Sequence, residues 1–348
     1  MVRQLAEGLN GKNSFLVEVL CCSRKGKGKE EAIKGVKVRR ASSLGIFWGM
    51  PLSFSFFCWF RKIRNAFDII DFHHPFPLGD LALLFFKPKG RLIVHYHSDI
   101  VRQKIFNFIL NPLTRSTLKK AEKIIVSNPN LKNSSPLLRD FREKCLVVPF
   151  GIDVRETESF FDKERIEKIK REYSPFVLFV GRLNYYKGVS YLIEAMKGVG
   201  ANLVIIGEGP EKNNLKLEIR NLDLKNKVFF LPHQPKRNLM NFHRAADVFV
   251  LPSIFKSEAF GLVLLEAMIG GTPVISTELQ TGTSWVNQNG KTGLVVPPKD
   301  AGVLIEALNK ILEDKEKAGL LGKEARERVL QNFTLPDMLQ KTKEVYIK

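Results

Sequence analysis

Two glutamates, Glu258 and Glu266, lie in the segment 257–266 with seven residues between them. Glu258 belongs to a predicted loop, and Glu266 lies inside a predicted helix that starts near Phe260. The free N–H groups at such a helix start favour an anion such as a diphosphate. At a rise of about 1.5 Å per residue, Glu266 would lie about 9 Å along the axis, suitably placed for ribose hydroxyls. Glu258 would stand beside the phosphates, where a sugar would be. The structural alternative is two glutamates that satisfy helix caps.

Two cations, Arg182 and Lys187, flank a predicted turn earlier in the same half of the chain. Arg182 follows a strand-like run that ends at Val180, and Lys187 precedes Gly188 at the start of the next predicted helix. Both would lie at the carboxyl edge of the sheet, where they can neutralise a diphosphate leaving group. Gly207 belongs to a third tight turn on that edge. Two solvated surface cations are the structural alternative.

Histidines follow two predicted strands in the first half of the chain. His97 and Asp99 come between a strand and a helix, so we expect His97 to face a cleft unless it is a hydrogen-bonded structural histidine. His95 and His97 point the same way in a strand, but no third ligand is placed, so no metal site is predicted. The residues His73-His74-Pro75 lie at another strand end and either line an acceptor side, with His74 as the candidate contact, or are structural.

Short apolar runs alternate with amphipathic stretches in the second half, which is typical of a parallel sheet covered on both faces. Ligands of such sheets bind outside the carboxyl ends of the strands. The predicted strands there are 176–180, 203–206, 228–231, 248–251 and 274–276, with helices at 189–197, 211–221, 238–246 and 261–269.

The first half repeats this rhythm. Its predicted strands are 15–20, 36–41, 69–72, 92–96, 124–127 and 146–148, and its predicted helices are 52–65, 77–87, 100–120 and 131–141. We therefore predict an α/β protein of two doubly wound, Rossmann-like domains facing a cleft. The expected divisions are an N-terminal domain at 1–152, a connection at 153–174, a C-terminal domain at 175–330, and a helix at 331–348 that packs back toward the N-terminal domain. Residues 2–9 already resemble the first helix of such a domain, so its opening strand and glycine-rich turn are expected to be missing.

Composition narrows the class of protein. The chain has 348 residues, a net charge of +19 and four cysteines without metal-binding spacing, which favours reduced thiols in a cytoplasmic protein. Residues 1–170 hold 31 Lys and Arg against 17 Asp and Glu, so this half could attract nucleic acid, anionic lipid or a phosphorylated substrate. Residues 41–60 carry no charge and have the length of a membrane span, but their glycines, proline and serines favour a strand end, a loop and an aromatic helix.

Taken together, these motifs resemble the family-4 glycosyltransferases of GT-B fold over essentially the whole chain. The motifs are His-Ser-Asp at 97–99, Val-Pro-x-Gly-Ile-Asp at 148–153, Gly-Arg-Leu…Lys-Gly at 181–188, Ala-Asp-Val-Phe-Val-Leu-Pro-Ser at 246–253, Ser-Glu-Ala-Phe-Gly…Leu-Glu-Ala-Met at 257–268 and Gly-Thr-Pro-Val-Ile-Ser at 271–276. Residues 97–100 together with Thr-Gly-Thr-Ser at 281–284 are most similar to bacterial mannosyl- and rhamnosyltransferases of surface-polysaccharide (O-antigen or capsule) assembly.

The resemblance implies a role for each matching residue. Arg182 and Lys187 would bind the diphosphate, Glu266 the ribose, and His97 would lie near the transferred sugar. The backbone of 259–262 would hold sugar and phosphate together with Glu258, and the strand end at 228–232 would border the base. The full expected donor set is Arg182, Lys187, Gly207, Leu231, Glu258, Ala259, Phe260, Gly261, Leu262 and Glu266, with His97, Glu258, Arg182 and Lys187 as catalytic residues and His74 and Asp99 on the acceptor side.

The resemblance further implies retention of anomeric configuration, no cofactor and no metal, with positive charge stabilising the leaving nucleotide diphosphate. The expected partners are a nucleotide sugar, preferably GDP-mannose, and a glycan or lipid-linked glycan acceptor. Peripheral contact with the inner face of the cell membrane is also expected, and nucleic acid is not. Members of the family carry a strand and glycine loop before the position of residue 1, so little activity is expected of the chain as written.

Three alternatives stay open. Another GT-B enzyme, such as a sugar-nucleotide epimerase or a phosphorylase, would need a different catalytic pattern, and no pyridoxal-binding lysine site is found. A nucleic-acid-binding protein is suggested by the charge alone, without a recognisable module or aromatic residues among the basic runs. A truncated, inactive sugar-nucleotide-binding remnant would bind its ligand without turnover.

Overall fold

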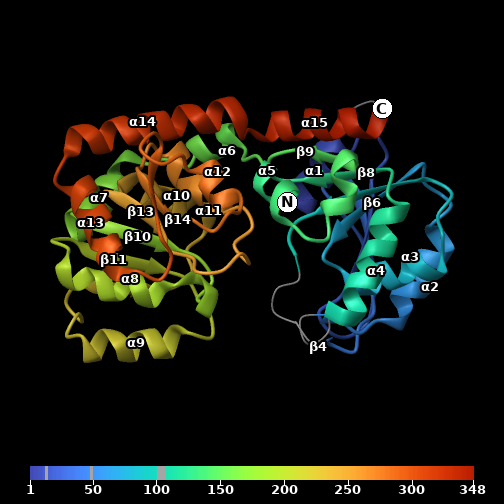
Figure 1. The fold of residues 1–348 in the computed structure, drawn as a ribbon, viewed down its shortest axis with the longest axis horizontal. Coiled ribbons are helices and arrows are strands. Elements are labelled where there is room, and N and C mark those ends of the chain that lie inside the picture. The colour runs from blue at the N-terminus through green and yellow to red at the C-terminus, as the bar shows by residue number, and fades with distance from the viewer. Residues whose placement is uncertain (12–14, 48–49, 100–106) are drawn as a thin grey trace. The chain divides into compact units, whose positions relative to one another are not determined.

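The computed structural model describes residues 1–11, 15–47, 50–99 and 107–348. These residues form two compact units, each with its own sheets and core. Unit 1 comprises Met1–Pro149 and Asp337–Lys348, and unit 2 comprises Phe150–Pro336 (Figure 1). The last helix, α15 (Leu335–Ile347), therefore begins in unit 2 and lies mostly in unit 1.

The sheet of unit 2 has six parallel strands in the order β12-β11-β10-β13-β14-β15. Their bounds are Phe176–Val180 for β10, Asn202–Ile206 for β11, Val228–Leu231 for β12, Val248–Leu251 for β13, Val274–Thr277 for β14 and Gly293–Val296 for β15. The five predicted strands are confirmed to within one residue, and β15 is an addition. Strands that are buried on both faces consist of continuous apolar runs, and this pattern predicted them. In the structure every residue of β10, β13 and β14 is buried.

Helices cover both faces of this sheet, as Figure 1 shows for α8, α9 and α13 against α10, α11 and α14. Alternate residues of β10 serve the two faces: Val177 and Phe179 enter one core, and Phe176 and Leu178 enter the other. The helices of unit 2 are α6 (Val154–Glu158), α7 (Lys163–Tyr173), α8 (Val189–Ala195), α9 (Lys212–Asn221), α10 (Lys236–Ala245), α11 (Leu262–Ile269), α12 (Gly282–Val286), α13 (Ala301–Leu312) and α14 (Lys315–Asn332), with single 3-10 turns at η2 (Tyr185–Lys187) and η3 (Met196–Gly198).

The strand order of unit 2 reverses direction once. From β10 the chain proceeds through β11 to β12 on one side, and then returns to β13 on the other side of β10. Loops that leave neighbouring strands on opposite sides of such a switch point open a crevice at the carboxyl ends. By this rule, a ligand of unit 2 is expected between the loops that follow β10 and β13.

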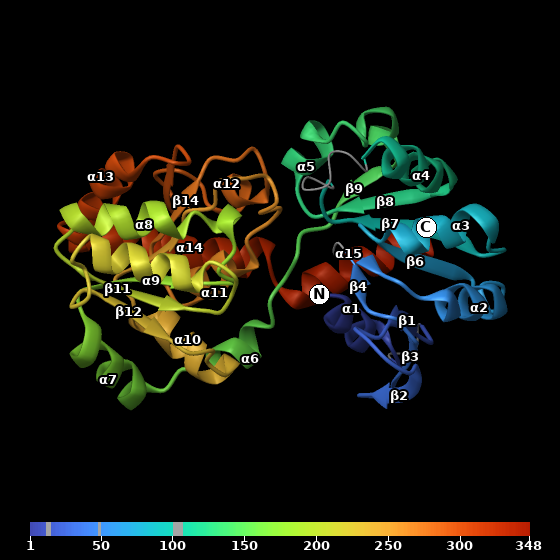
Figure 2. The same ribbon diagram turned by 90° about the horizontal axis from the view of Figure 1, so that it is seen from below.

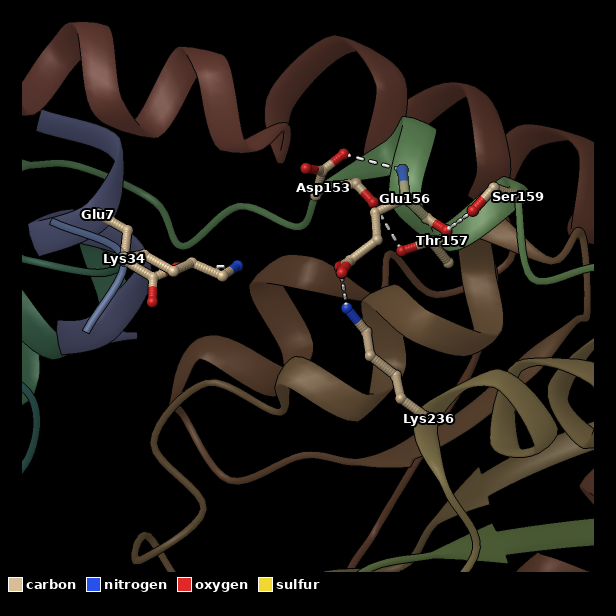
Figure 3. Close-up of polar contacts among 7 residues, drawn as sticks. All are labelled: Glu7, Lys34, Asp153, Glu156, Thr157, Ser159 and Lys236. Atoms are coloured by element: carbon tan, nitrogen blue, oxygen red, sulfur yellow. Dashed lines mark hydrogen bonds and ion pairs between the residues drawn. The ribbon is translucent and has the colours of Figure 1, made fainter. Parts of the chain in front are cut away.

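Residues 153–174, expected to connect the domains, instead fold into α6 and α7 of unit 2. Asp153 caps α6 by accepting a hydrogen bond from Glu156 N at 3.0 Å, and Glu156 pairs with Lys236 of α10 (Figure 3). Thr157 Oγ1 also donates to the carbonyl of Asp153 at 2.6 Å. The many charged residues of this segment suggested a linker, but in the structure they form the solvent-exposed face of α7.

Unit 1 contains a parallel sheet, β6-β7-β8-β9, and a separate three-stranded sheet in the order β1-β3-β2, both visible in Figure 2. The strands are β1 (Glu18–Cys22), β2 (Lys29–Ile33), β3 (Val36–Ala41), β4 (Ile46–Phe47), β5 (Met50–Pro51), β6 (Ile69–His74), β7 (Arg91–Tyr96), β8 (Lys123–Val126) and β9 (Cys145–Val147). The helices are α1 (Val2–Leu9), α2 (Phe54–Ile63), α3 (Pro77–Phe85), α4 (Asn107–Lys120), α5 (Pro129–Ser134) and the 3-10 turn η1 (Arg139–Lys144).

Two first-half predictions need correction, and the start of a third lies outside the described residues. The strand expected at 15–20 begins only at Glu18. The helix expected at 131–141 is divided into α5 and η1, because Ser135 adopts an extended conformation at the end of α5. The helix expected from residue 100 is α4, whose first residues as predicted, 100–106, lie outside the described ranges.

The hairpin of β2 and β3 was not predicted. Its two-residue turn, Lys34-Gly35, has positive φ at both positions, as a type I′ turn requires. The charged sequence of β2 hid the strand. Arg39 pairs with Glu30 at 3.0 Å across the hairpin, and Arg40 pairs with Glu31.

The uncharged segment 41–60 is divided among the end of β3, the hairpin β4–β5 and the start of α2. Ser53 begins α2 by accepting a hydrogen bond from Phe56 N at 3.1 Å. Within the described ranges, none of the helices has both the length and the apolar character needed to cross a membrane.

Candidate donor site and histidine cluster

Lys187 and Glu258 form an ion pair at the switch point of unit 2. Lys187 Nζ contacts Glu258 Oε2, and Ser253 Oγ donates to the same oxygen at 3.0 Å. Lys187 is 8% exposed and Glu258 9%. The pair therefore joins the turn after β10 to the loop after β13. Sequence reasoning placed both residues at one edge of the sheet, and the structure adds that they contact one another.

A close backbone approach holds these two loops together. Gly188 has φ 62°, and a Cβ there would lie 2.1 Å from the carbonyl oxygen of Pro252. Ile254 N also donates to the carbonyl of Tyr186 at 2.8 Å. Only glycine fits at residue 188, because a side chain there would collide with the loop after β13 and φ is positive. Gly188 is therefore the residue at which the turn after β10 can lead into α8.

The turn after β11 packs against the turn after β10. A Cβ on Gly207 would lie 1.9 Å from the carbonyl oxygen of Gly181, so this predicted site residue has a packing role whatever it binds. Arg182 follows Gly181 and has no side-chain hydrogen bond or ion pair within the described part of the chain. Its charge is thus available at the carboxyl edge of the sheet. Leu231 ends β12 at the same edge and is half-buried.

The loop 259–261 leads into α11. Gly261 has φ 78°, and its αL conformation starts the helix, in whose first turn Leu264 N donates to the carbonyl of Gly261 at 2.8 Å. Leu262, the first residue of α11, is 37% exposed. Phe260 is only 3% exposed and packs edge-on against Trp285 and Phe333. The Phe260 side chain therefore belongs to the core, and only its backbone remains as a candidate contact.

Glu266 lies in α11 and faces His243 of α10. Its Oε2 is 3.7 Å from His243 Nε2, and the Glu266 side chain is 28% exposed. His243 is fully buried, and neither ring nitrogen has a hydrogen bond within the described residues. Glu266 thus combines a buried neighbour with an exposed carboxylate edge, and a ribose could reach only that edge.

In unit 1, His97 belongs to a cluster of three histidines. His73 Nδ1 and His97 Nε2 are 2.9 Å apart, while the rings of His73 and His95 stack with centroids 4.6 Å apart. Asp71 lies beside the cluster, 3.3 Å from His73 Nε2 through Oδ2 and 3.3 Å from His95 Nε2 through Oδ1. The sequence placed His95 and His97 together and His73 at another strand end, but it missed Asp71 and the contact of His73 with His97.

Burial and mutual repulsion control the protonation of this cluster. Burial, together with the neighbouring imidazoles of His73 and His95, lowers the pKa of His97 to about 3. Burial likewise lowers the pKa of His95 to about 4, although Asp71 opposes the shift. Burial disfavours the Asp71 carboxylate, but the adjacent imidazoles and a hydrogen bond from Tyr346 prevail and hold the pKa of Asp71 well below its ordinary value. Both His95 and His97 are neutral near pH 7.

Asp71, His73 and His95 place one potential ligand atom each within 4.8 Å of the others, so the cluster must be tested as a metal site. The His73 and His95 rings are inclined by only 19° and stacked. Their in-plane lone pairs lie in nearly parallel planes and cannot both point at one ion. The described side chains do not fit a metal in this arrangement, and we derive no metal step.

The two residues expected on the acceptor side have structural surroundings. His74 is 1% exposed, stacks on Tyr96 at 4.6 Å and lies 3.5 Å from buried Asp80. This burial favours the structural alternative for His74, and its contact with an acceptor stays a prediction. Asp99 accepts hydrogen bonds from Tyr96 and Ser135, both at 2.6 Å, and so ties β7 to α5.

Ser253, Asp71 and Tyr346 were not among the predicted site residues. Asp71 and His73 are two positions apart in a strand, which puts them on one face and could have indicated a shared site. Tyr346 had no such signal, because it is 275 residues from Asp71 in sequence.

Both halves of the chain match known families. Residues 1–156 match the family model described as Glycosyltransferase Family 4, and residues 160–328 match the model described as Glycosyl transferases group 1. Among solved structures, sucrose-phosphate synthase of Thermosynechococcus elongatus has a TM-score of 0.84 at 23% identity, covering 99% of this chain and 91% of that one. Anabaena HepE in complex with UDP has a TM-score of 0.72 at 21% identity, covering 84% and 81%. These structures share the GT-B fold with this chain.

Two curated relatives are closer in sequence. The chain is 36% identical over 283 residues to O-antigen chain mannosyltransferase C of Escherichia coli, covering 80% of this chain and 75% of the relative. It is 35% identical over 283 residues to D-rhamnosyltransferase WbpZ of Pseudomonas aeruginosa, covering 81% and 74%. With the fold and the motifs at the carboxyl edge of the unit 2 sheet, these matches show that the chain belongs to the family-4 glycosyltransferases of GT-B fold.

Proposed function

We propose that this glycosyltransferase moves a hexose, with mannose preferred, from a nucleotide diphosphate sugar to a glycan or lipid-linked oligosaccharide. The observation that carries the proposal is the buried Lys187–Glu258 pair at the switch point of unit 2. Arg182 follows the same strand as Lys187, β10, and has no side-chain hydrogen bond or ion pair among the described residues. GDP-mannose is the preferred donor, since one relative is a mannosyltransferase.

The charges at this edge suit a diphosphate leaving group. Arg182 contributes an available guanidinium and α11 contributes free N–H groups, both of which stabilise negative charge. Glu258 holds Lys187 in place and can accept hydroxyl groups of the donor sugar through its remaining oxygen. Glu266 would receive the ribose hydroxyls at its exposed edge.

The proposed reaction proceeds with retention. The bond between the anomeric carbon and the β-phosphate oxygen breaks, and the acceptor oxygen bonds to the same face of that carbon. The acceptor proton passes to the departing phosphate oxygen, so charge and atoms balance. Positive charge at the phosphate takes the electrostatic role that a metal has in other transferases. His97 would contact the transferred sugar as a neutral imidazole.

Calorimetric titration tests the donor site directly. We expect the purified chain to bind GDP and GDP-mannose more tightly than UDP and UDP-glucose, and Glu266→Ala to weaken that binding. Glu194→Ala is the matched control, because Glu194 is an exposed glutamate on α8 of the same unit. Tighter binding of UDP would mean that the donor is a UDP-sugar. An absence of binding by folded protein would contradict the proposed donor site.

We also propose peripheral contact with an anionic membrane through unit 1. The hairpin β4–β5 and the start of α2 carry exposed apolar side chains, with Leu44 78%, Phe47 55% and Phe54 83% exposed. Trp59 and Lys62 line a groove beside Leu44 and Phe54, so apolar and cationic groups share one surface. Such a surface suits insertion at the headgroup level of an anionic bilayer.

Flotation with vesicles tests this contact. We expect binding to phosphatidylcholine vesicles that contain phosphatidylglycerol, and loss of binding in the double variant Phe47→Ser with Phe54→Ser. Leu320→Ser in α14 is the control, since Leu320 is 59% exposed but belongs to unit 2. Equal flotation of both variants would contradict the proposed surface.

A further inference from the structure

Polar side chains run along one face of two neighbouring strands in unit 1. Asp71 and His73 alternate along β6, and the parallel register places His73 opposite His95 of β7. His97 follows β7, and its Nε2 lies 2.9 Å from His73 Nδ1. His73 therefore bridges Asp71 and His97, with one ring nitrogen toward each.

Helix α15, near the end of the chain, adds one more side chain, Tyr346, to this series of polar contacts. Tyr346 OH donates to Asp71 Oδ2 at 2.6 Å. Its backbone carbonyl accepts from Arg91 Nη1 at 2.6 Å, and Arg91 is itself held by Glu122 at 2.8 and 2.9 Å. Phe15 packs edge-on against the Tyr346 ring at 5.6 Å. Tyr346 is thus fixed both through its backbone and through its ring.

The direction of each hydrogen bond follows from protonation. Burial and the adjacent Asp71 raise the pKa of Tyr346 far above its ordinary value, so its hydroxyl remains a donor. Asp71 is ionised and can only accept. The Nε2 of His73 faces this acceptor, so Nε2 is the nitrogen that must carry a proton, and in the Nε2–H tautomer Nδ1 is the acceptor toward His97. His97 must in turn donate from Nε2, so its proton lies there and its Nδ1 is unprotonated.

We propose that Tyr346, Asp71 and His73 are positioning residues that hold the His97 imidazole in one orientation and in the Nε2–H tautomer. The importance of that tautomer for transfer rests on the proposed role of His97 at the donor sugar. A change of tautomer would exchange the donor and acceptor nitrogens of the ring, which alters every hydrogen bond that His97 makes.

We call the series of contacts from Tyr346 through Asp71 and His73 to His97 the relay. The relay also connects the C-terminal helix α15 to His97. Leu335 and Pro336, at the start of α15, belong to unit 2, whereas Tyr346 ends in the core of unit 1. Undocking of α15 would withdraw the hydroxyl from Asp71 and the carbonyl from Arg91 together. Asp71 would then have one hydrogen bond fewer to fix the carboxylate that orients His73 and, through it, His97.

Nitrogen NMR on protein labelled with ¹⁵N-histidine tests the relay without any substrate. At pH 8 we expect His73 and His97 each as a single Nε2–H tautomer, with the signals assigned by His73→Gln and His97→Gln. In Asp71→Leu, which removes the acceptor but approximates its size, we expect mixed tautomers at both rings. Asp71→Asn should restore the single tautomer, because the amide oxygen can occupy the Oδ2 position.

Three results would overturn the proposal. These are a wild-type His97 protonated on Nδ1, an unchanged His97 tautomer in folded Asp71→Leu, and stoichiometric shifts of His73 and His95 on addition of Zn²⁺. The last result would make the cluster a metal site.

Kinetics separate positioning from folding. We expect Tyr346→Phe to lower kcat with GDP-mannose roughly fivefold, as the loss of one hydrogen bond would, while the Kd for GDP stays unchanged because GDP is assigned to unit 2. Tyr191→Phe, which removes a hydroxyl from α8, is the control. An unchanged kcat in Tyr346→Phe contradicts the relay. An absence of GDP binding in the wild type contradicts the donor site and leaves the NMR result to decide the relay.

Discussion

The ammonium of Lys187 contacts the carboxylate of Glu258 although the two residues are 71 positions apart in sequence and both are about nine-tenths buried. The pair connects the loops on either side of the point where the strand order reverses. Ser253 adds a neutral donor to the same carboxylate oxygen. Removal of either charged partner would leave the other as an uncompensated buried charge.

We therefore predict that Lys187→Met lowers the free energy of unfolding by about 3 kcal/mol, a magnitude typical of breaking a buried pair. The double variant Lys187→Met with Glu258→Gln should recover part of this loss, because no lone charge remains. Urea unfolding of the single and double variants measures the coupling. Strictly additive losses would show that the two side chains do not interact in solution.

Arg182 should behave in the opposite way. Since its side chain has no ion-pair partner within the described ranges, Arg182→Ala should change the free energy of unfolding by less than about 0.5 kcal/mol. Loss of a charged hydrogen bond to the diphosphate should nevertheless weaken GDP binding roughly tenfold or more. Calorimetry checks the affinity, with the exposed Lys197→Ala as a cation control in the same unit. Unchanged affinity would remove Arg182 from the donor site.

Gly207 offers a test of the packing beneath the site. An alanine Cβ at residue 207 would lie 1.9 Å from the carbonyl oxygen of Gly181, so the turn after β10 must move. We predict that Gly207→Ala destabilises unit 2 by about 2 kcal/mol and also weakens nucleotide binding. Gly200→Ala is the matched control, because a Cβ there would meet nothing within 4 Å. Thermal unfolding compares the Tm of Gly207→Ala with that of Gly200→Ala. Similar Tm values would contradict the close approach of Gly207 to Gly181.

The histidine cluster predicts a dependence of stability on pH. The folded pKa values of His95 and His97 are about 4 and about 3, whereas an unfolded histidine titrates near 6.5. Between these values the unfolded chain binds more protons than the folded chain, so stability rises with pH. The contribution is fully present above pH 6.5 and is lost as pH falls toward 4, by on the order of 3 kcal/mol for each of the two histidines.

Urea unfolding at pH 7.5, 6.5, 5.5 and 4.5 measures this loss. His97→Gln should reduce the slope between pH 6.5 and 4.5, while His233→Gln, at an exposed position, provides the control. An identical slope in His97→Gln and the wild type would show that His97 is not held neutral by its surroundings.

Much of the fold and part of the site could be predicted from local sequence. The strands of unit 2 were predicted because both faces of each strand are buried, which requires continuous apolar runs. The hairpin of β2 and β3 was missed, because its stabilising contacts are charge pairs such as Arg39 with Glu30 rather than apolar alternation. Residues 153–174 were assigned to a connection, since a polar helix face and a linker have similar composition.

The sequence by itself determined which residue types stand at the strand ends, because those positions follow from the apolar pattern and the turn glycines. Only the tertiary structure decided their partners. Lys187 contacts Glu258 because β10 and β13 are neighbours in the sheet, and Tyr346 reaches Asp71 because α15 returns to unit 1. Burial separated His74, enclosed against Tyr96 and Asp80, from His97, bonded to His73. Such pairings depend on strand order and chain return, which local periodicity does not encode.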